Sequence, residues 1–440
     1  MMSLQDELTP LMTANVDAGT VKGLTILTAG VFVVGEMAGS GVLALPKAVV
    51  DTGWFGIVMI ILCAISSAYT AIILGRCWII LQNRFPLYRE HVPYPYPAIG
   101  YEAFGNPGKY IVSFCVLFTL FGVSTVFLLI ASENIQSLFT GGISFCAWLP
   151  IIAAVLCPFT WLGTPKDFWP IAVGAMSATV LACLLMFVQI LMDIKINPEP
   201  QHSNTTFKKF FVAFGTILFA FGGHAAFPTI QHDMKRPSNF KWGVIWSYAV
   251  IVLMYLPVAT SGYFIYGDKL DTNPNGDSIL SLMSPGGITT TVTVLITAHL
   301  TFGYIIVINP FCQQFEEALG VKPGFGIKRC IVRSFVVACN LFVAETIPHF
   351  GAILSLVGGS TVVFLTFVFP SLFYIRLMTM EDDGNKPVII PLYERVIHYE
   401  IILIGIFGGI ASTFSAIDDM ASGASSFTVP CYVNASAAHL

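Results

Sequence analysis

Long apolar segments recur along the whole chain and are separated by short polar stretches. Each segment has about 20 or more residues, which is enough for a helix to cross roughly 30 Å of hydrocarbon. Because backbone polar groups cannot stay unpaired in lipid, the pattern predicts helices rather than strands. The predicted membrane-spanning helices are residues 24–50, 54–81, 110–138, 145–163, 167–193, 209–231, 242–266, 287–310, 328–347, 350–378 and 396–417.

Two of these predicted helices are interrupted near the middle of the membrane. The first contains "GEMAGSGVLALP" at 35–46, in which residues 39–41 are Gly-Ser-Gly. The sixth contains Gly-Gly-His at 222–224, and Pro228 follows four residues later. A glycine inside a helix costs about 1 kcal/mol relative to alanine, so each cluster needs a reason.

Two explanations compete for the first interruption. Gly35 and Gly39 form a GxxxG pattern, which is a common helix-packing motif. However, if helices one to five and six to ten are two repeats, both interruptions lie in the first helix of a repeat, and the repeats are inverted. Paired interruptions of this kind indicate a transporter's binding site. Free helix N-termini suit a carboxylate and unwound carbonyls suit an ammonium group or a cation, so we expect an amino acid substrate.

Four stretches resemble the amino acid/auxin permease family. They are "GSGVLALP" at 39–46, "YPAIGYEAFG" at 96–105, "FAFGGHAAFPTIQHDMKRP" at 219–237 and "IPHFGAILSLVGGS" at 347–360. The resemblance covers roughly residues 22–417. It implies an all-α, leucine-transporter-like fold of five plus five inverted helices with an eleventh appended, in which helices one and six are discontinuous. It also implies secondary transport of amino acids driven by protons or sodium.

By the same resemblance, the two interruptions line the substrate site. The expected substrate-binding residues are Gly39, Ser40, Gly41, Val42, Phe221, Gly222, Gly223 and His224. The phenylalanines of the sixth helix offer an apolar lining, which favours neutral amino acids. Glu36 departs from the family pattern, where a small polar residue is more usual, and this leaves the coupling ion open.

Ionisable side chains at membrane depth are costly, at least about 2.5–3.5 kcal/mol in the charged form, so each is a candidate for ion coupling. Glu36, His224 and His299 lie near mid-depth and could carry a proton. Thr297 and Thr301 lie four apart on one helix face and could bind sodium. The structural alternatives are a neutral carboxylic acid, core imidazoles with satisfied partners, and hydroxyls bonded to their own helix.

Composition agrees with a membrane transporter. The 440-residue chain is 55% hydrophobic and only 10% charged, with a net charge of −4, which argues against a nucleic acid partner. Its ten cysteines include no CxxC pair, so no metal site is expected. No Walker A sequence is present, so ATP-driven pumping is not expected. We expect no enzymatic activity and no cofactor; the only partners expected are an amino acid, the coupling ion and the lipid bilayer.

Charge placement predicts a cytosolic N-terminus. In that orientation the outer side holds only five of the basic residues: Lys47, Lys195, Lys208, Lys209 and Lys269. An odd number of spans then places the C-terminus outside. The N-x-S/T acceptors Asn204 and Asn434 both fall on this outer side, as do Cys146 and Cys431, which could form a disulfide.

The predicted organisation is a single transmembrane domain. A polar cytosolic tail covers 1–21, and the transporter domain covers 22–417. Its two repeats span about 24–193 and 209–378, its extra helix spans about 396–417, and an outer tail covers 418–440. A plasma membrane and an endolysosomal or vesicle membrane both fit, and the oligomeric state stays open. The competing functions are a haem-binding redox protein, which would use His224 and His299 as ligands, and a channel.

Overall fold

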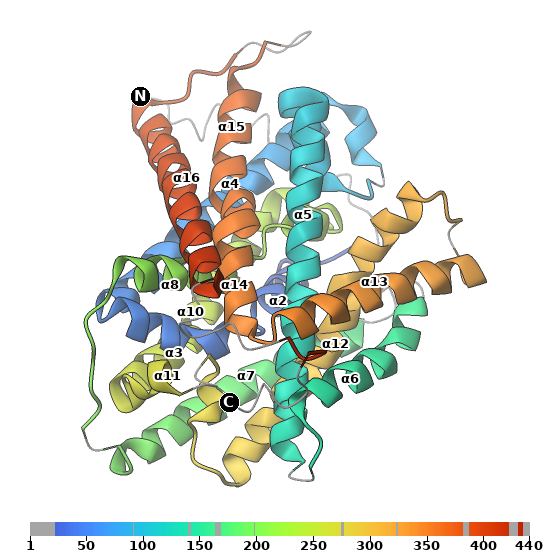
Figure 1. Cartoon of the computed structure of the whole chain (residues 1–440). Helices are drawn as coiled ribbons and strands as arrows, with labels where there is room; N and C mark the ends of the chain where they lie inside the picture. Colours follow the sequence, from blue (N-terminus) through green and yellow to red (C-terminus); the bar gives the residue numbers. More distant parts are fainter. Residues whose placement is uncertain are drawn as a thin grey trace.

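The chain folds into helices, as predicted. The computed structural model describes residues 23–90, 92–139, 142–162, 169–197, 199–273, 277–322, 324–381, 387–421 and 430–433. Among these residues the one β-type pairing is an isolated bridge between Leu24 and Met234. The helices, shown in Figure 1, are α2 (Ile26–Met37), α3 (Gly41–Thr52), α4 (Phe55–Arg84), α5 (Pro95–Leu138), α6 (Phe145–Trp161), α7 (Trp169–Met192), α8 (Phe207–Ala220), α9 (Phe227–His232), α10 (Phe240–Tyr266), α11 (Lys269–Thr272), α12 (Gly287–Ala318), α13 (Ile327–Thr346), α14 (Phe350–Val357), α15 (Phe369–Thr379) and α16 (Leu392–Ala421).

Seven helical stretches of the described residues are long and apolar enough to cross a membrane, and the pair α2 and α3 makes an eighth if it counts as one bent span. The shorter α6 is also apolar. The remaining predicted spans do not meet these length and composition criteria, for reasons that the structure and sequence make clear. Helix α8 ends after 14 residues, and α13 carries Lys328, Arg329 and Arg333 in its first two turns. The total of eleven spans stays a prediction.

The helix over the first apolar segment ends at Met37 and resumes at Gly41, with a bend of 57° between its halves. Ending a helix leaves its last carbonyl groups without intrahelical partners. The Tyr255 hydroxyl on α10 donates to one of them, the carbonyl of Met37, at 2.6 Å. Gly35 has no atom within 4 Å of a Cβ placed on it, so the GxxxG packing explanation is wrong at that residue.

The sixth apolar segment divides in the same way. Helix α8 ends at Ala220 and α9 begins at Phe227. The two interruptions lie side by side, because a Cβ placed on Gly41 would approach the Cα of Ala220 to 2.8 Å, and one placed on Gly223 would approach Met37 Cγ to 2.9 Å. Glycines at these two positions therefore allow the four half-helices to meet.

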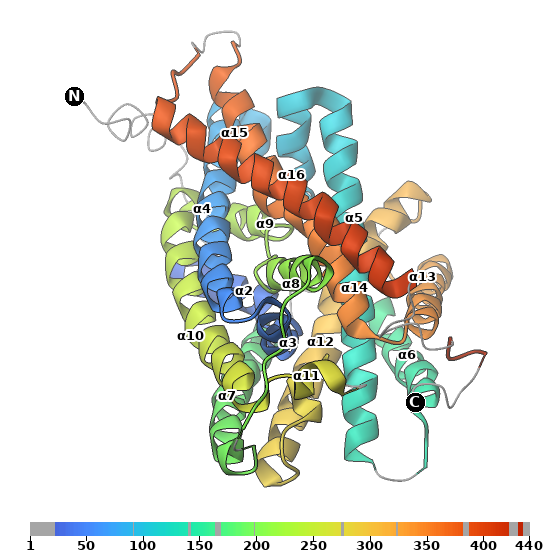
Figure 2. The ribbon, with the colours of Figure 1, turned by 60° about the vertical axis from the view of Figure 1, so that its left-hand side comes forward.

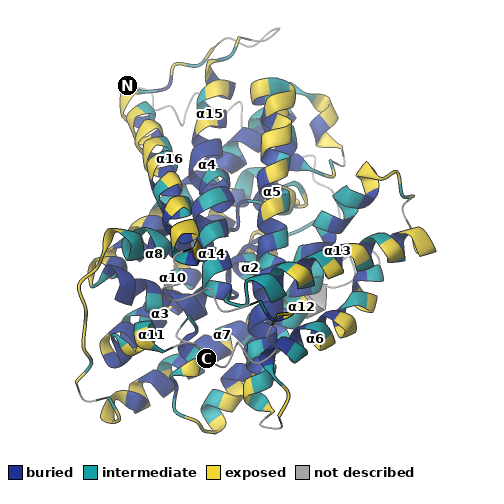
Figure 3. Cartoon of the chain, viewed as in Figure 1, coloured by how far each residue is buried: buried dark blue, intermediate teal, exposed yellow. Residues whose placement is uncertain are grey.

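The tenth apolar segment is a continuous helix that contains two π-helical parts. Residues Gly358–Val362 and Phe364–Val368 join α14 to α15. Helix α16 crosses this helix diagonally (Figure 2), and Ser412 of α16 packs closely against Gly359. The side of α16 that faces away from the molecule is exposed, whereas α3 is almost wholly buried (Figure 3). The interrupted helices thus form the centre of the molecule, and α16 lies at its periphery.

A buried charged cluster joins α6, α12 and α13. Arg333 is fully buried; its Nε donates to Glu316 Oε1 at 2.5 Å, and its Nη1 donates to Asn309 Oδ1 at 2.9 Å and to the carbonyl of Thr160. A buried ion pair is tolerated when further hydrogen bonds satisfy both partners, as here. Asn309 lies on α12 two residues from Val307, so the cluster is anchored to a helix that also contributes to the central cavity.

Candidate functional site

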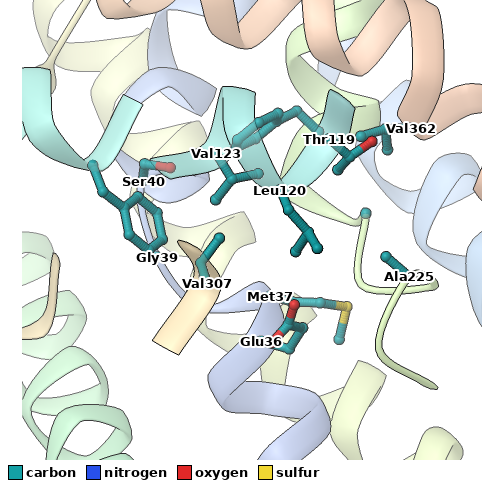
Figure 4. A pocket seen from close by; sticks show the side chains of 13 residues that line it. Glu36, Met37, Gly39, Ser40, Thr119, Leu120, Val123, Ala225, Val307 and Val362 are labelled. Atoms are coloured by element: carbon teal, nitrogen blue, oxygen red, sulfur yellow. The ribbon is translucent and has the colours of Figure 1, made fainter. Parts of the chain in front are cut away.

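A cavity lies where the two interruptions meet α5, α12 and the π-helical segment Gly358–Val362 (Figure 4). Its empty volume is about 500 Å³, including the open space at its mouth. The residues that line it are Glu36, Met37, Gly39, Ser40, Thr119, Leu120, Val123, Phe127, Phe219, Gly222, Ala225, Val307 and Val362.

Two polar side chains of the first interruption, Glu36 and Ser40, line the cavity, and in Figure 4 they lie apart from each other. Glu36 is half-buried because it faces the cavity, and no hydrogen bond or ion pair joins its carboxylate to the described residues. Ser40 is 1% exposed, its Oγ also has no hydrogen-bond partner there, and it stands at the N-terminus of α3. A buried polar group without a partner is costly, so both side chains are available to a ligand.

The side of the cavity away from Glu36 is apolar apart from one hydroxyl pair. In Figure 4, Thr119 and Val362 lie next to each other, away from Glu36 and Met37. Thr119 Oγ1 and Thr361 Oγ1 are hydrogen-bonded at 2.7 Å, which joins α5 to the π-helical segment. Leu120 and Val123 complete this wall. A ligand that fits both the polar side chains and this wall has a charged or polar head and an aliphatic body.

Of the residues predicted to bind substrate, Gly39, Ser40 and Gly222 line the cavity, whereas Gly41, Val42, Phe221 and Gly223 do not. Gly41 and Gly223 instead permit the close contacts between half-helices, and Val42 and Phe221 are fully buried.

His224 lies outside the cavity lining and is 1% exposed. Its Nε2 lies 3.2 Å from Thr70 Oγ1, whose proton is donated to a carbonyl of its own helix α4. The hydroxyl therefore accepts, and Nε2 is the donor. The ring also packs on Phe227, with 4.9 Å between centroids. These contacts describe an imidazole that joins the second interruption to α4.

His299 lies on α12, and its Nδ1 is 3.2 Å from the carbonyl oxygen of Ala175 on α7. Because a carbonyl can only accept, Nδ1 carries the proton, and Nε2 is left as an acceptor. Nε2 faces the first interruption, 3.5 Å from a Cβ placed on Gly39. His299 does not line the cavity, but it lies directly behind Gly39.

Both predicted sodium-binding hydroxyls are engaged within their own helix. Thr297 Oγ1 donates to the carbonyl of Thr293 at 2.6 Å, and Thr301 Oγ1 donates to the carbonyl of Thr297 at 2.7 Å. Each hydroxyl keeps acceptor capacity, so these bonds leave the sodium prediction untested.

Cys146 and Cys431 are joined in a disulfide, which connects the start of α6 to the segment after α16. The backbone N–H of Cys431 also donates to the carbonyl of Glu345 at 2.9 Å, next to the end of α13. Asn204 is exposed in the connection between α7 and α8, whereas Asn434 lies outside the described residues.

Sequence reasoning missed the part of the cavity that α5, α12 and the tenth segment contribute. Thr119, Val123, Phe127, Val307 and Val362 all lie within long apolar helices, where the residue type carries no sign of which positions face a cavity. The π-helical segment that carries Val362 likewise has no sequence signal beyond its two glycines.

Comparisons with known proteins agree with the fold and the class of function. The family model described as "Transmembrane amino acid transporter protein" matches residues 22–415. The amino acid transporter AVT1E of Arabidopsis thaliana is 27% identical over 397 residues, covering 87% of this chain and 70% of that protein. AVT1J of the same plant is 25% identical over 405 residues, covering 88% and 89%.

The manganese transporter of Eremococcus coleocola, in a mutant form, has a TM-score of 0.59 with 9% identity, covering 94% of this chain and 92% of that one. At that identity the match shows the fold alone, and it agrees with the predicted fold class. The family match over nearly the whole length also excludes the haem protein and channel alternatives as the class of function. The chain belongs to the transmembrane amino acid transporter family.

Proposed function

We propose that this amino acid transporter is a proton-coupled symporter that binds neutral amino acids in the cavity between the two interruptions. The observation that carries the proposal is that Glu36, Gly39 and Ser40 of the first interruption and Gly222 of the second line one cavity. This is the arrangement expected of paired discontinuous helices that hold a substrate at mid-membrane and alternate its access between the two sides.

The polar groups of the first interruption suit the two charged groups of an amino acid. The Ser40 hydroxyl and the N-terminus of α3 offer donors and a partial positive charge to the substrate carboxylate. The carbonyls released where α2 ends suit the ammonium group. Because the rest of the lining is apolar and carries no second charge, the substrate side chain is neutral.

Charge balance argues for the proton as the coupling ion. Among the described residues, Glu36 is the one ionisable side chain that lines the cavity, and no cationic residue lines it. A neutral amino acid adds no net charge, so a proton on Glu36 best removes the cost of the carboxylate when the cavity closes. Sodium is the competing coupling ion, and Thr297 and Thr301 are its candidate ligands.

The experiment is uptake of a mixed amino acid pool into proteoliposomes that contain the purified full-length chain. A proton gradient and a sodium gradient are imposed separately. We expect the proton gradient alone to drive concentrative uptake of neutral amino acids, with saturation and countertransport. Uptake driven only by sodium would move the coupling role away from Glu36, and no uptake under either gradient would refute the proposed function.

The finer organisation belongs to the same proposal. Helix order and charge placement support two inverted repeats, a cytosolic N-terminus and an outer C-terminus, and the N-x-S/T pattern supports glycan attachment at Asn204 and Asn434. A plasma membrane or an endolysosomal membrane is compatible with this orientation. Glycosidase treatment of protein from cells, with Asn204→Gln as the control, tests which side carries this connection.

A further inference from the structure

We infer that Val362 sets the upper size of the substrate side chain, and that the hydrogen bond between Thr119 and Thr361 positions it. This inference rests on the proposed function and specifies its substrate class as neutral amino acids with a short aliphatic side chain. It concerns the tenth apolar segment, which enters the site through its π-helical part.

Val362 forms the apolar limit of the cavity. It lines the cavity, and its Cγ1 occupies the space into which a Cβ on Gly222 would project. The side chain of Val362 therefore stands directly against the backbone of the second interruption. A longer substrate side chain that points away from Glu36 meets this valine before it can pass between α8 and the tenth segment.

Val362 is the last residue of the π-helical part Gly358–Val362. Three successive residues face three different neighbours. Thr361 bonds Thr119 on α5, Val362 faces the cavity and Gly222, and Val363 lies 2.8 Å from a Cβ placed on Gly409 of α16. Single π-helical turns are rare and are frequent at functional sites.

The Thr119–Thr361 bond holds this register. Both threonines are about 95% buried, at 4% and 5% exposed, and their hydroxyls are 2.7 Å apart. A buried hydroxyl without a hydrogen-bond partner lowers the stability of the folded protein. The bond therefore keeps the π-helical turn fixed against α5. Thr361 acts through Val362 and is a positioning residue, because it does not itself line the cavity.

The remaining wall defines the chemistry of the side chain that fits. Leu120, Val123 and Val307 also line the cavity and offer only hydrocarbon. Phe127 closes the cavity toward Gly39, with its ring 3.4 Å from a Cβ placed there. The space thus accepts alanine-like and valine-like side chains in preference to aromatic ones.

The test compares kcat/KM for alanine, leucine and phenylalanine in proteoliposomes. Val362→Ala should raise the phenylalanine-to-alanine ratio of kcat/KM about tenfold, since one or two methyl groups in an apolar pocket change discrimination by about that factor or more. Val363→Ala is the matched control. It removes the same atoms from the next residue, on the side that faces α16, and should leave the ratio unchanged.

A second substitution keeps the test decisive if Val362→Ala does not fold. Val362→Ile adds one methylene toward the cavity and should lower the leucine-to-alanine ratio. If alanine uptake persists in either Val362 variant and the ratios stay at the wild-type values, Val362 does not determine specificity and only this inference fails. If the wild-type chain transports no amino acid, the proposed function fails and this inference falls with it.

The positioning role of Thr361 is tested by separate substitutions. Thr361→Val removes the hydroxyl at nearly constant volume and should shift the size preference in the direction of Val362→Ala, mainly through KM. Thr361→Ser keeps a hydroxyl and should restore the wild-type ratios. A loss of kcat for all substrates alike in Thr361→Val, with unchanged ratios, would assign the bond to stability alone.

Discussion

The proposed proton coupling depends on the carboxylate of Glu36. This carboxylate faces the cavity with no partner among the described residues, although an ionised carboxylate within a membrane needs one. His299 lies close by, behind Gly39, with Nε2 free to accept a hydrogen bond. Glu36 and His299 thus both lie at the first interruption.

Glu36→Gln should remove proton coupling and spare exchange. The amide keeps the shape of the side chain but cannot take up a proton, so uptake driven by an inward proton gradient should fall about tenfold or more. Counterflow of a labelled amino acid at equal pH on both sides should persist. The two assays on the same proteoliposomes separate coupling from binding.

Glu133→Gln is the matched control, because Glu133 is also a carboxylate within a predicted span but does not line the cavity. It should leave proton-driven uptake close to the wild-type rate. If Glu36→Gln instead keeps the wild-type pH dependence, Glu36 has a structural role and another group carries the proton.

At the scale of the elements, the site exists because two helices stop in the same place. The Gly41–Ala220 contact brings the N-terminus of α3 against the C-terminus of α8, and Tyr255 satisfies a carbonyl released by α2. The glycines around the interruptions therefore have distinct tasks. Gly41 permits contact between half-helices, while a Cβ placed on Gly35 would meet no atom within 4 Å.

Because Gly41 and Gly35 have these different roles, alanine substitution at the two positions should have opposite effects on stability. Gly41→Ala places a Cβ 2.8 Å from the backbone of Ala220, which cannot move aside as a flexible side chain can. It should lower stability by about 1–3 kcal/mol and reduce uptake. Gly35→Ala is the control, since it meets no atom within 4 Å and replaces a helix-interior glycine, which should stabilise α2 by about 0.5–1 kcal/mol.

Thermal unfolding of the purified variants in detergent, alongside uptake, measures both effects. Equal stability of the two variants would contradict the assignment of Gly41 to the contact between half-helices.

The helices and the two interruptions were accessible from sequence because their causes are local. Residues 39–41 and 222–224 fall where α2 and α8 end, since clustered glycines weaken a helix wherever they occur. The cavity was accessible only in part. Glu36, Ser40 and Gly222 are unusual residues for a membrane span, whereas Val123 and Val362 are ordinary ones. Which apolar residue faces a cavity is decided by tertiary packing, and sequence does not display it.

At the scale of the whole molecule, charged contacts hold the end that contains the connections 193–207 and 267–287. Asp271 of α11 accepts from Lys209 of α8 at 2.6 Å and from Lys47 of α3 at 3.3 Å. One carboxylate therefore joins both half-helices that lead away from the cavity at this end.

Asp271→Asn should loosen this end of the molecule. The neutral amide keeps at most one weak contact to each lysine, so backbone hydrogen exchange in residues 267–273 should speed up. Asp418→Asn is the control, because Lys208 keeps a second acidic partner, Asp419, at 3.2 Å. Unchanged exchange in Asp271→Asn would show that apolar packing alone holds the connection.

The contacts of Asp271 with the two lysines also predict how the protection of the wild-type backbone from hydrogen exchange depends on pH. Burial raises the pKa of Asp271, but the hydrogen bond from Lys209 and the charge of Lys47 outweigh it and hold the pKa below its ordinary value. A carboxylate with a lowered pKa keeps its contribution until the pH falls through that lowered value. Protection of residues 267–273, corrected for intrinsic exchange, should therefore persist into mildly acidic solution.

The disulfide between Cys146 and Cys431 also has a consequence for biosynthesis. The two cysteines are 285 residues apart, so the thiol of Cys146 must wait unpaired while most of the chain is translated and inserted. The bond can close only after the segment that follows α16 has reached the start of α6. Its formation therefore marks a chain in which these two distant parts have met, and non-reducing electrophoresis of newly made protein can time that step.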